Sequence, residues 1–285
     1  MGQATVSAGP VLAVVLAALV TLAVAAAAIG RLGVSRAVIT ASVRAVVQLG
    51  AVSLLIAAVL HSWWATAGFI VLMTLVATAT SARRVSTLRL GWLVILPIVF
   101  GVAPAGTVIV AAGTMPMTEV AVLPIAGILI GGAMTATSLA GRRALDELRN
   151  RHGEYEAALA LGFLPRDAAL EVARPTAAQA LVPALDQTRT VGLVTLPGAF
   201  VGVLLGGGSA VQAGATQLLV LIALLAAEAI AAAVTLELVA RGLIRRPHGT
   251  ETPTRSGWRS RTSTTPGSSE PERRSWLARR GKRQR

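Results

Sequence analysis

Few side chains in this sequence could bind a solute inside a membrane, because most ionisable residues lie outside the apolar stretches. Glu228 is near the middle of the last apolar stretch, and Arg44 and Gln48 lie four residues apart in the second. A carboxylate at that depth needs a cation, a proton or water, and an arginine either extends to the aqueous boundary or faces a solute path. Together with the hydroxyls of Thr135 and Ser138, these residues are candidates for a substrate pathway.

Each candidate also has a structural interpretation. Glu228 could pair with Arg44 or hydrogen-bond with Gln48, which would neutralise it without any solute. The hydroxyls of Thr135 and Ser138 could bond back to their own helix backbone, as hydroxyls in membrane helices often do. The residue types alone leave both interpretations open.

Several kinds of chemistry are excluded by composition. The chain has no cysteine, so disulfides and thiolate ligands are absent, and its three histidines are far apart in sequence. Its single lysine, Lys282, is not part of a GxxxxGK[ST] motif, so the chain carries no P-loop for ATP hydrolysis. No nucleophile has a candidate base beside it, and no ligand cluster is visible. We therefore expect no enzyme activity, no metal site and no cofactor bound by this chain.

The apolar residues predict an all-α, multi-pass membrane protein. The 285 residues are 54% hydrophobic, which is typical of membrane proteins. Runs of about 18 apolar residues are long enough to cross the hydrocarbon core. Seven such runs predict seven transmembrane helices in a permease domain of residues 1–244: 11–29, 37–60, 63–80, 91–112, 120–140, 190–207 and 215–239.

Basic residues predict the orientation. If the N-terminus lies outside, 25 of the 26 basic residues fall in inside segments and the remaining one is Arg44. The positive-inside rule therefore favours N-out and C-in, with residues 141–189 in the cytoplasm. Residues 245–285 hold 12 basic and 3 acidic residues, net +9, with too few apolar residues to fold alone. We expect a disordered cytoplasmic tail that does not bind nucleic acid.

The 141–189 segment has its own local signals. Leu145, Leu148, Tyr155, Leu159 and Leu161 lie near helical spacing among charged residues, which predicts one amphipathic helix from about Gly141. Gly162 is expected to end this helix in the left-handed conformation. Pro165 suits the first position of the next helix and Asp167 its positive end, although Leu164 is a poor N-cap. The segment should therefore form a helix, a tight turn and a second helix.

Glycine and proline mark the sixth run. Gly198, Gly202 and Gly206 recur every four residues and give a flat stripe for close helix packing. Pro197 precedes them and is expected to bend the span, because it removes one internal hydrogen bond.

Within the 141–189 segment, a spaced motif resembles a known signature. Glu156-Ala157-Ala158 is followed after three residues by Gly162, and after nine more by Val172-Ala173-Arg174-Pro175. This resembles the EAA signature of ABC-transporter permeases, with Val172 and Arg174 in place of the expected Ile and Leu. Further motifs are residues 42–44 with 48–49, 134–140, 156–165, 186–194 and 196–198.

On these motifs, residues 8–244 resemble the iron-export ABC permease family of FetB type, which is related to plant aluminium-tolerance proteins. Ala210 departs from the pattern, because similar proteins tend to have proline there. The resemblance implies a permease that pairs with itself in the plasma (inner) membrane and with a separate ATP-binding subunit, which uses the ATP. It also implies that Glu156, Ala157, Ala158, Gly162 and Pro165 couple the two subunits, and that iron is exported.

Other readings stay open. The chain could be an ABC permease for another solute, such as a small anion near Arg44, or one that works in the import direction. It could also be a gradient-driven secondary transporter or channel, although a seven-span chain without clear inverted halves fits that class less well.

Overall fold

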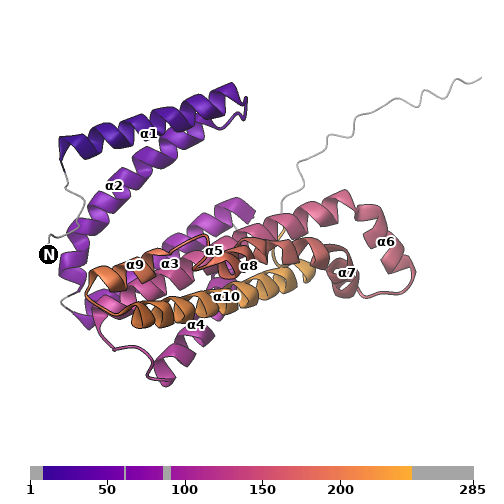
Figure 1. The fold of residues 1–285 in the computed structure, drawn as a ribbon. Helices are drawn as coiled ribbons and strands as arrows, with labels where there is room; N and C mark the ends of the chain where they lie inside the picture. Colours follow the sequence, from indigo (N-terminus) through magenta and orange to yellow (C-terminus); the bar gives the residue numbers. More distant parts are fainter. Residues whose placement is uncertain (1–8, 61, 86–90, 246–285) are drawn as a thin grey trace, which may run out of the picture. The chain divides into compact units, whose positions relative to one another are not determined.

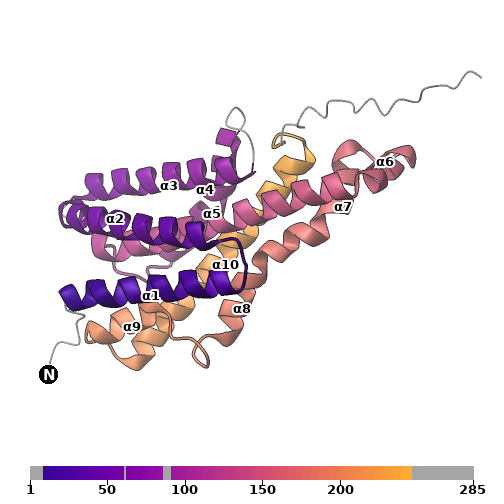
Figure 2. The same ribbon diagram turned by 90° about the horizontal axis from the view of Figure 1, so that it is seen from above.

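The computed structural model describes residues 9–60, 62–85 and 91–245, so the predicted basic tail lies outside the described residues except for Arg245. The described chain is almost entirely helical and contains no strand, apart from one isolated bridge between Val191 and Thr195. Figures 1 and 2 show the helices from two sides. In chain order they are α1 (Pro10–Ile29), α2 (Ser35–Val59), α3 (Trp63–Val85), the 3₁₀ helix η1 (Gly91–Val94), α4 (Ile95–Ala111), α5 (Glu119–Asn150), α6 (His152–Ala160), α7 (Pro165–Ala178), the 3₁₀ helix η2 (Gln179–Leu181), α8 (Val182–Thr190), α9 (Gly198–Leu205) and α10 (Ala210–Ala240).

Six of the expected spans are helices long and apolar enough to cross a bilayer: α1, α2, α3, η1 with α4, α5 and α10. The all-helical membrane fold is thereby confirmed. The orientation of the helices stays a prediction, because length and composition do not assign the two sides.

The seventh expected span, 190–207, is not one helix. Helix α8 ends at Thr190, residues 191–197 form a turn, and α9 covers only Gly198–Leu205. Gly192 has φ 82° and its N–H bonds to the carbonyl of Thr195 at 2.9 Å, while Pro197 is extended at the N-cap of α9. Pro197, which is predicted to bend this span, thus lies at the interruption between α8 and α9.

The core lies where α10 packs against α4 and α5. Small residues let these helices approach closely: a Cβ on Gly101 would lie 2.6 Å from the carbonyl oxygen of Ala227, and one on Gly132 would lie 2.7 Å from Glu228 Oε1. Ala133, Ala136 and the neighbouring alanines of α10 are fully or nearly fully buried. This is the small-residue packing that holds membrane helices together where lipid supplies no hydrophobic drive.

Helices α1 and α2 form a hairpin that closes at Arg31 and Gly33, both with positive φ. Among the side chains described, Ala27 is the one buried residue of α1 and Val59, the last residue of the helix, is the one buried residue of α2. Most of the large apolar side chains of the two helices therefore face outward, which suits a lipid or protein neighbour rather than water.

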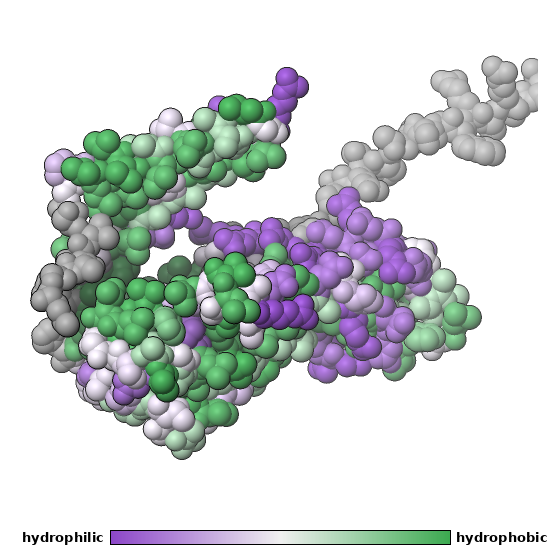
Figure 3. Space-filling model, viewed as in Figure 1, coloured by the Kyte–Doolittle hydropathy of each residue, from purple (hydrophilic) through white to green (hydrophobic). Residues whose placement is uncertain are grey.

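Polar and apolar surfaces separate along the molecule. Figure 3 shows hydrophobic residues over the long helices and hydrophilic residues gathered around α6, α7 and the end of α5. This division places the 141–189 segment at the polar end of the helices, as its charged residues predict.

Candidate coupling and transport sites

The EAA motif lies on the short helix α6. Glu156 and Ala157 are exposed and Ala158 is half-buried, and α6 contains no buried residue. Glu156 Oε1 lies 3.4 Å from Nδ1 of His152, one turn earlier on the same helix. Glu156, Ala157 and Ala158 are therefore not core residues of this chain, and they leave a short, small-residue surface for a neighbour. In the later part of the signature, on α7, Val172 and Ala173 are buried.

The turn after α6 has the predicted form. Gly162 has φ 93°. Its N–H donates to the carbonyl oxygen of Leu159 at 3.0 Å, and the N–H of Phe163 donates to the carbonyl oxygen of Ala158 at 3.1 Å. These two bonds are the Schellman pattern that closes a helix with glycine in the left-handed region. Pro165 then begins α7, and Leu164 makes no side-chain cap, as expected.

The helix before this turn differs from the prediction. Instead of one amphipathic helix from Gly141, α5 continues to Asn150 and a break at Arg151, with φ −110° and ψ 36°, separates it from α6. Arg151 bridges the break, because its Nη1 lies 3.3 Å from Glu147 and its Nε bonds to Glu154 Oε1 at 2.6 Å. Local ion pairs on both sides of one residue carry no periodic signal, so the pattern of apolar residues could not reveal the break.

An apolar tip on this polar segment was also missed. Leu161, which fits the apolar period, is 81% exposed, and Phe163 and Leu164 are 48% and 68% exposed. We call these three side chains the apolar tip. Figure 3 shows an apolar patch at the α6–α7 end, bordered by hydrophilic residues. Single exposed apolar residues are common, but three around one turn form a surface suited to a partner.

The base of the α6–α7 unit is firmly packed. Ala169 and Leu170 of α7 form a buried cluster with Ala240 at the end of α10. Leu148 of α5 and Tyr155 of α6 pack against this cluster, which agrees with their predicted place on an apolar face. The tip therefore projects from a base that four helices share.

An ion-pair group, also unpredicted, ties the start of α7 to α10. Arg166 donates from Nε to Glu237 Oε1 at 2.6 Å and from Nη2 to Oε2 at 2.8 Å. Arg241 donates to the same Oε1 at 2.6 Å, and Arg166 also reaches Asp167 at 2.8 Å. Arg166 and Glu237 are 71 residues apart, so no local spacing rule could have joined them.

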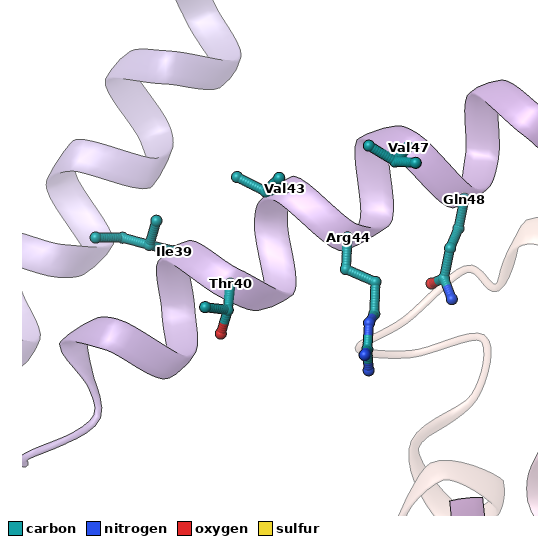
Figure 4. Close-up of a pocket in the computed structure, with 6 residues that line it drawn as sticks. All are labelled: Ile39, Thr40, Val43, Arg44, Val47 and Gln48. Carbon is teal, nitrogen blue, oxygen red and sulfur yellow. The ribbon is translucent and has the colours of Figure 1, made fainter.

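On α2, Arg44 and Gln48 share a face with Thr40, as their spacing predicts. Figure 4 shows these three side chains on one side of the helix. They line a shallow, open cavity of about 500 Å³ together with Ile39, Val43 and Val47. Arg44 and Gln48 are exposed, and no ion pair of Arg44 is found within the described ranges.

Glu228 lies in the opposite kind of environment. Its residue is 9% exposed, and its side chain lies against Gly132 of α5 at the helix contact described above. In the described chain the carboxylate has no ion pair or hydrogen bond, so neither Arg44 nor Gln48 neutralises it. The intramolecular pair that the sequence left open is not formed.

The two hydroxyl candidates are engaged in helix contacts. Thr135 Oγ1 donates to the carbonyl of Gly131 at 2.9 Å. Ser138 Oγ lies 3.0 Å from Ser81 Oγ, and Ser81 donates to the carbonyl of Met134 at 3.1 Å. Thr135 and Ser138 are on α5, as Gly132 is, but their hydroxyls satisfy the packing of α5 on itself and on α3.

A second, larger cavity of about 1010 Å³ opens between the start of α5, α9 and the first half of α10. Its lining is almost wholly apolar and includes Met115, with Thr114 and Thr216 as its hydroxyl groups. No group of three or more His, Asp or Glu residues that could hold a metal ion occurs within the residues described.

Comparison with known proteins gives a consistent family. Residues 11–244 match the model of the uncharacterised protein family UPF0014. The UPF0014 membrane protein STAR2 of rice is 29% identical over 216 residues, which cover 75% of this chain and 76% of the rice protein. Protein ALUMINUM SENSITIVE 3 of Arabidopsis thaliana is 31% identical over 161 residues, 56% of this chain and 59% of that protein.

A bacterial relative carries a more specific name. The "Probable iron export permease protein FetB" of Escherichia coli is 29% identical over 141 residues, which cover 50% of this chain and 54% of that protein. No solved structure was found that matches the chain significantly. The family match spans the described part of the chain, residues 9–245 with its gaps, apart from its first two residues and its last. The chain therefore belongs to the UPF0014 family of membrane proteins, which confirms the resemblance carried by its sequence motifs.

Proposed function

We propose that this chain is the membrane-spanning permease subunit of an ABC transporter, and that a separate ATP-binding subunit docks on residues 153–175. The observation that carries the proposal is the apolar tip, three exposed side chains beside the EAA motif on an otherwise polar segment. Apolar surface of this kind is unfavourable in water and favours burial by a partner. The adjacent Glu156-Ala157-Ala158 and Gly162 indicate which partner, because the EAA signature is typical of permeases driven by an ATPase.

The geometry suggests how the motif residues would take part. Ala157 and Ala158 have side chains short enough for a groove wall to approach the helix closely, and exposed Glu156 could accept hydrogen bonds from the partner in addition to its contact with His152. Gly162 and Pro165 shape the turn that presents the apolar tip. The chain would do no ATP chemistry itself, since ATP binding and hydrolysis belong to the partner.

A pull-down from native membranes in mild detergent tests this proposal. We expect an ATPase with a Walker motif to co-purify with the wild type and to be lost from Phe163→Glu, which places a charge in the apolar tip. Leu32→Glu is the matched control, because Leu32 is 66% exposed in the turn between α1 and α2. Folded, abundant wild-type protein that brings no ATPase would overturn the proposal and favour a gradient-driven transporter.

For the solute, we propose a metal cation, iron, moved outward. The support is the name of the bacterial relative and the unpaired carboxylate of Glu228, whose oxygen chemistry suits a hard cation. Thr135 and Ser138 on α5 and the Arg44–Gln48 face of α2 are the further pathway candidates. Glu119, the acidic residue that begins α5, is a further carboxylate for such a cation. ATP-driven iron uptake into inverted vesicles tests the assignment, and uptake that is unchanged after Glu228 and Glu119 are both replaced by alanine would refute it.

We further propose that two copies of the chain pair in the plasma membrane. The exposed, charged face of α2 supports pairing, because a second copy or a water-filled path could cover Arg44 at lower cost than lipid. Native mass spectrometry of the purified complex should give two permease chains for two ATPase chains. A complex with one permease chain would contradict this part of the proposal.

A further inference from the structure

Helix α10 connects the two candidate sites of this chain. Glu228 lies within its apolar part, and Glu237 lies nine residues further toward the α6–α7 end, which corresponds to about 14 Å of helix. No proline interrupts α10 between these positions. A displacement of the Glu237 end along the helix axis would therefore move Glu228 by nearly the same distance.

The contact between Arg166 and Glu237 is suited to transmit such a displacement. Both oxygens of the carboxylate accept from the guanidinium, at 2.6 and 2.8 Å. This paired geometry fixes direction as well as distance, which a single contact or a lysine would not do. Arg241 also donates to Oε1 of the same carboxylate at 2.6 Å, so Glu237 has little freedom to turn away.

Arg166 lies in the chain directly between the apolar tip and the rest of α7. It is the second residue of α7 and follows the apolar tip after Pro165. A partner that moves the tip must move the first turn of α7, and Arg166 joins that turn to α10. About one turn further on, α7 is already packed against α10 through Leu170 and Ala240, so the ion pair is a second attachment nearer to the tip.

Stability alone gives a weak reason for this arrangement. The Arg166 and Glu237 side chains are 47% and 28% exposed, and ion pairs at such exposure contribute little to folding. By contrast, α10 meets α5 at Gly132 without spare space beside Glu228. In a contact packed this closely, a small shift of α10 changes the surroundings of the carboxylate.

We propose that the Arg166–Glu237 pair is the coupling link between the ATPase-docking turn and α10, so that movement of the tip shifts α10 and with it Glu228. The inference rests on the proposed function and deepens it by naming the positioning residues. Arg166 and Glu237 act on the solute path through α10 and touch neither ATP nor solute.

The experiment uses the full permease–ATPase complex and reports on α10 without a known solute. A single cysteine is introduced as Val211→Cys, at the end of α10 that is opposite Glu237. Val211 is 82% exposed, and the natural chain contains no cysteine that would compete for the label. The rate of thiol labelling is compared with and without ATP. Arg166→Ala, Glu237→Gln, Arg166→Lys and the double variant Arg166→Ala/Glu237→Gln are each added to this background.

Arg151→Ala is the matched control. Arg151 also pairs with a glutamate through two nitrogens, but its partner Glu154 is three residues away on the same segment, so the pair does not reach α10. We expect this variant to keep the wild-type response, whereas Arg166→Ala and Glu237→Gln reduce the ATP-dependent change about 2- to 30-fold. The double variant should be no worse than either single one, because both remove the same contact. The ATP-dependent change in labelling rate of Arg166→Lys should lie between those of the wild type and Arg166→Ala.

Co-purification of the ATPase separates the possible failures. Every variant should retain the ATPase, because the apolar tip and Glu156-Ala157-Ala158 are unchanged. Loss of the ATPase from Arg166→Ala but not from Glu237→Gln would place Arg166 in the docking surface and overturn its role as the coupling link. A wild-type response to ATP in Arg166→Ala, with the ATPase bound, would overturn the coupling link and leave the permease assignment intact. A labelling rate that ATP does not change in the unsubstituted background would overturn the link as well. Absence of the ATPase from the wild type would overturn both.

Discussion

Arg44 and Glu228 are both isolated charged side chains within spanning helices, yet the chain surrounds them differently. Arg44 lies nine residues from the start of α2 and Glu228 twelve from the end of α10, about 14 and 18 Å from the ends predicted to face inside. Glu228 is enclosed by α5 and α10, whereas Arg44 stands on an exposed face. The difference teaches that packing within the chain encloses the carboxylate of Glu228, whereas any enclosure of the Arg44 guanidinium must come from a neighbour outside the chain.

The largest effect is expected where the enclosure of Glu228 is closest. A side chain at Gly132 would overlap Leu224 and lie 2.7 Å from Glu228 Oε1, whereas one at the adjacent Gly131 would meet nothing within 4 Å. We expect Gly132→Val to lower the free energy of unfolding by about 3 kcal/mol or more, because the core has no room for it. Thermal unfolding in detergent measures this, with Gly131→Val as the control; equal losses in both would contradict the account.

The next effect concerns transport rather than stability. Glu228→Gln keeps the shape of the side chain and removes its charge from a site without a partner in the described chain. We expect the free energy of unfolding to be unchanged or raised by about 1 kcal/mol, since no ion pair is lost. ATP-driven solute movement should fall at least tenfold, about 1.4 kcal/mol in the barrier. Unchanged transport would remove Glu228 from the pathway.

On the exposed side of the comparison, Arg44→Leu should hardly affect the isolated chain. Because Arg44 is exposed and has no ion pair in the described chain, we expect the free energy of unfolding to change by no more than about 0.5 kcal/mol. Self-association of the permease should weaken, which sedimentation in detergent measures. A large loss of stability in the monomer would indicate that Arg44 has an internal partner after all.

The spans and the turn were predictable from sequence because local rules decide them. Long apolar runs mark the helices, and Gly162 and Pro165 fix the α6–α7 turn through backbone preferences that do not depend on the rest of the fold. The interruption of 190–207 was only partly visible, since Pro197 predicted a bend but not the loss of seven residues from the helix. The Arg166–Glu237 pair and the exposure of Leu161 depend on tertiary packing and could not be read from spacing.

The smallest predicted effect is the pH response of the pair at the α5–α6 break. The hydrogen bond from Arg151 lowers the pKa of Glu154 below its ordinary value. A lowered folded pKa contributes stability that is present above the unfolded pKa of about 4.3 and is lost as pH falls through the folded value. Because Glu154 is exposed, Glu154→Gln should make the melting temperature only slightly less sensitive to acid between about pH 6 and pH 3. A steeper acid response in the variant would reverse the assigned sign.

The most direct test of the central claim is a contact made from the apolar tip in native membranes. A photo-crosslinking amino acid at Phe163, compared with one at Leu32, would report what covers each exposed site before any detergent is added. We predict that the Phe163 position crosslinks to a chain with a Walker motif and that the Leu32 position does not. Crosslinks from Phe163 only to lipid, or equal capture of the ATPase from both positions, would contradict the claim that an ATPase docks on this turn.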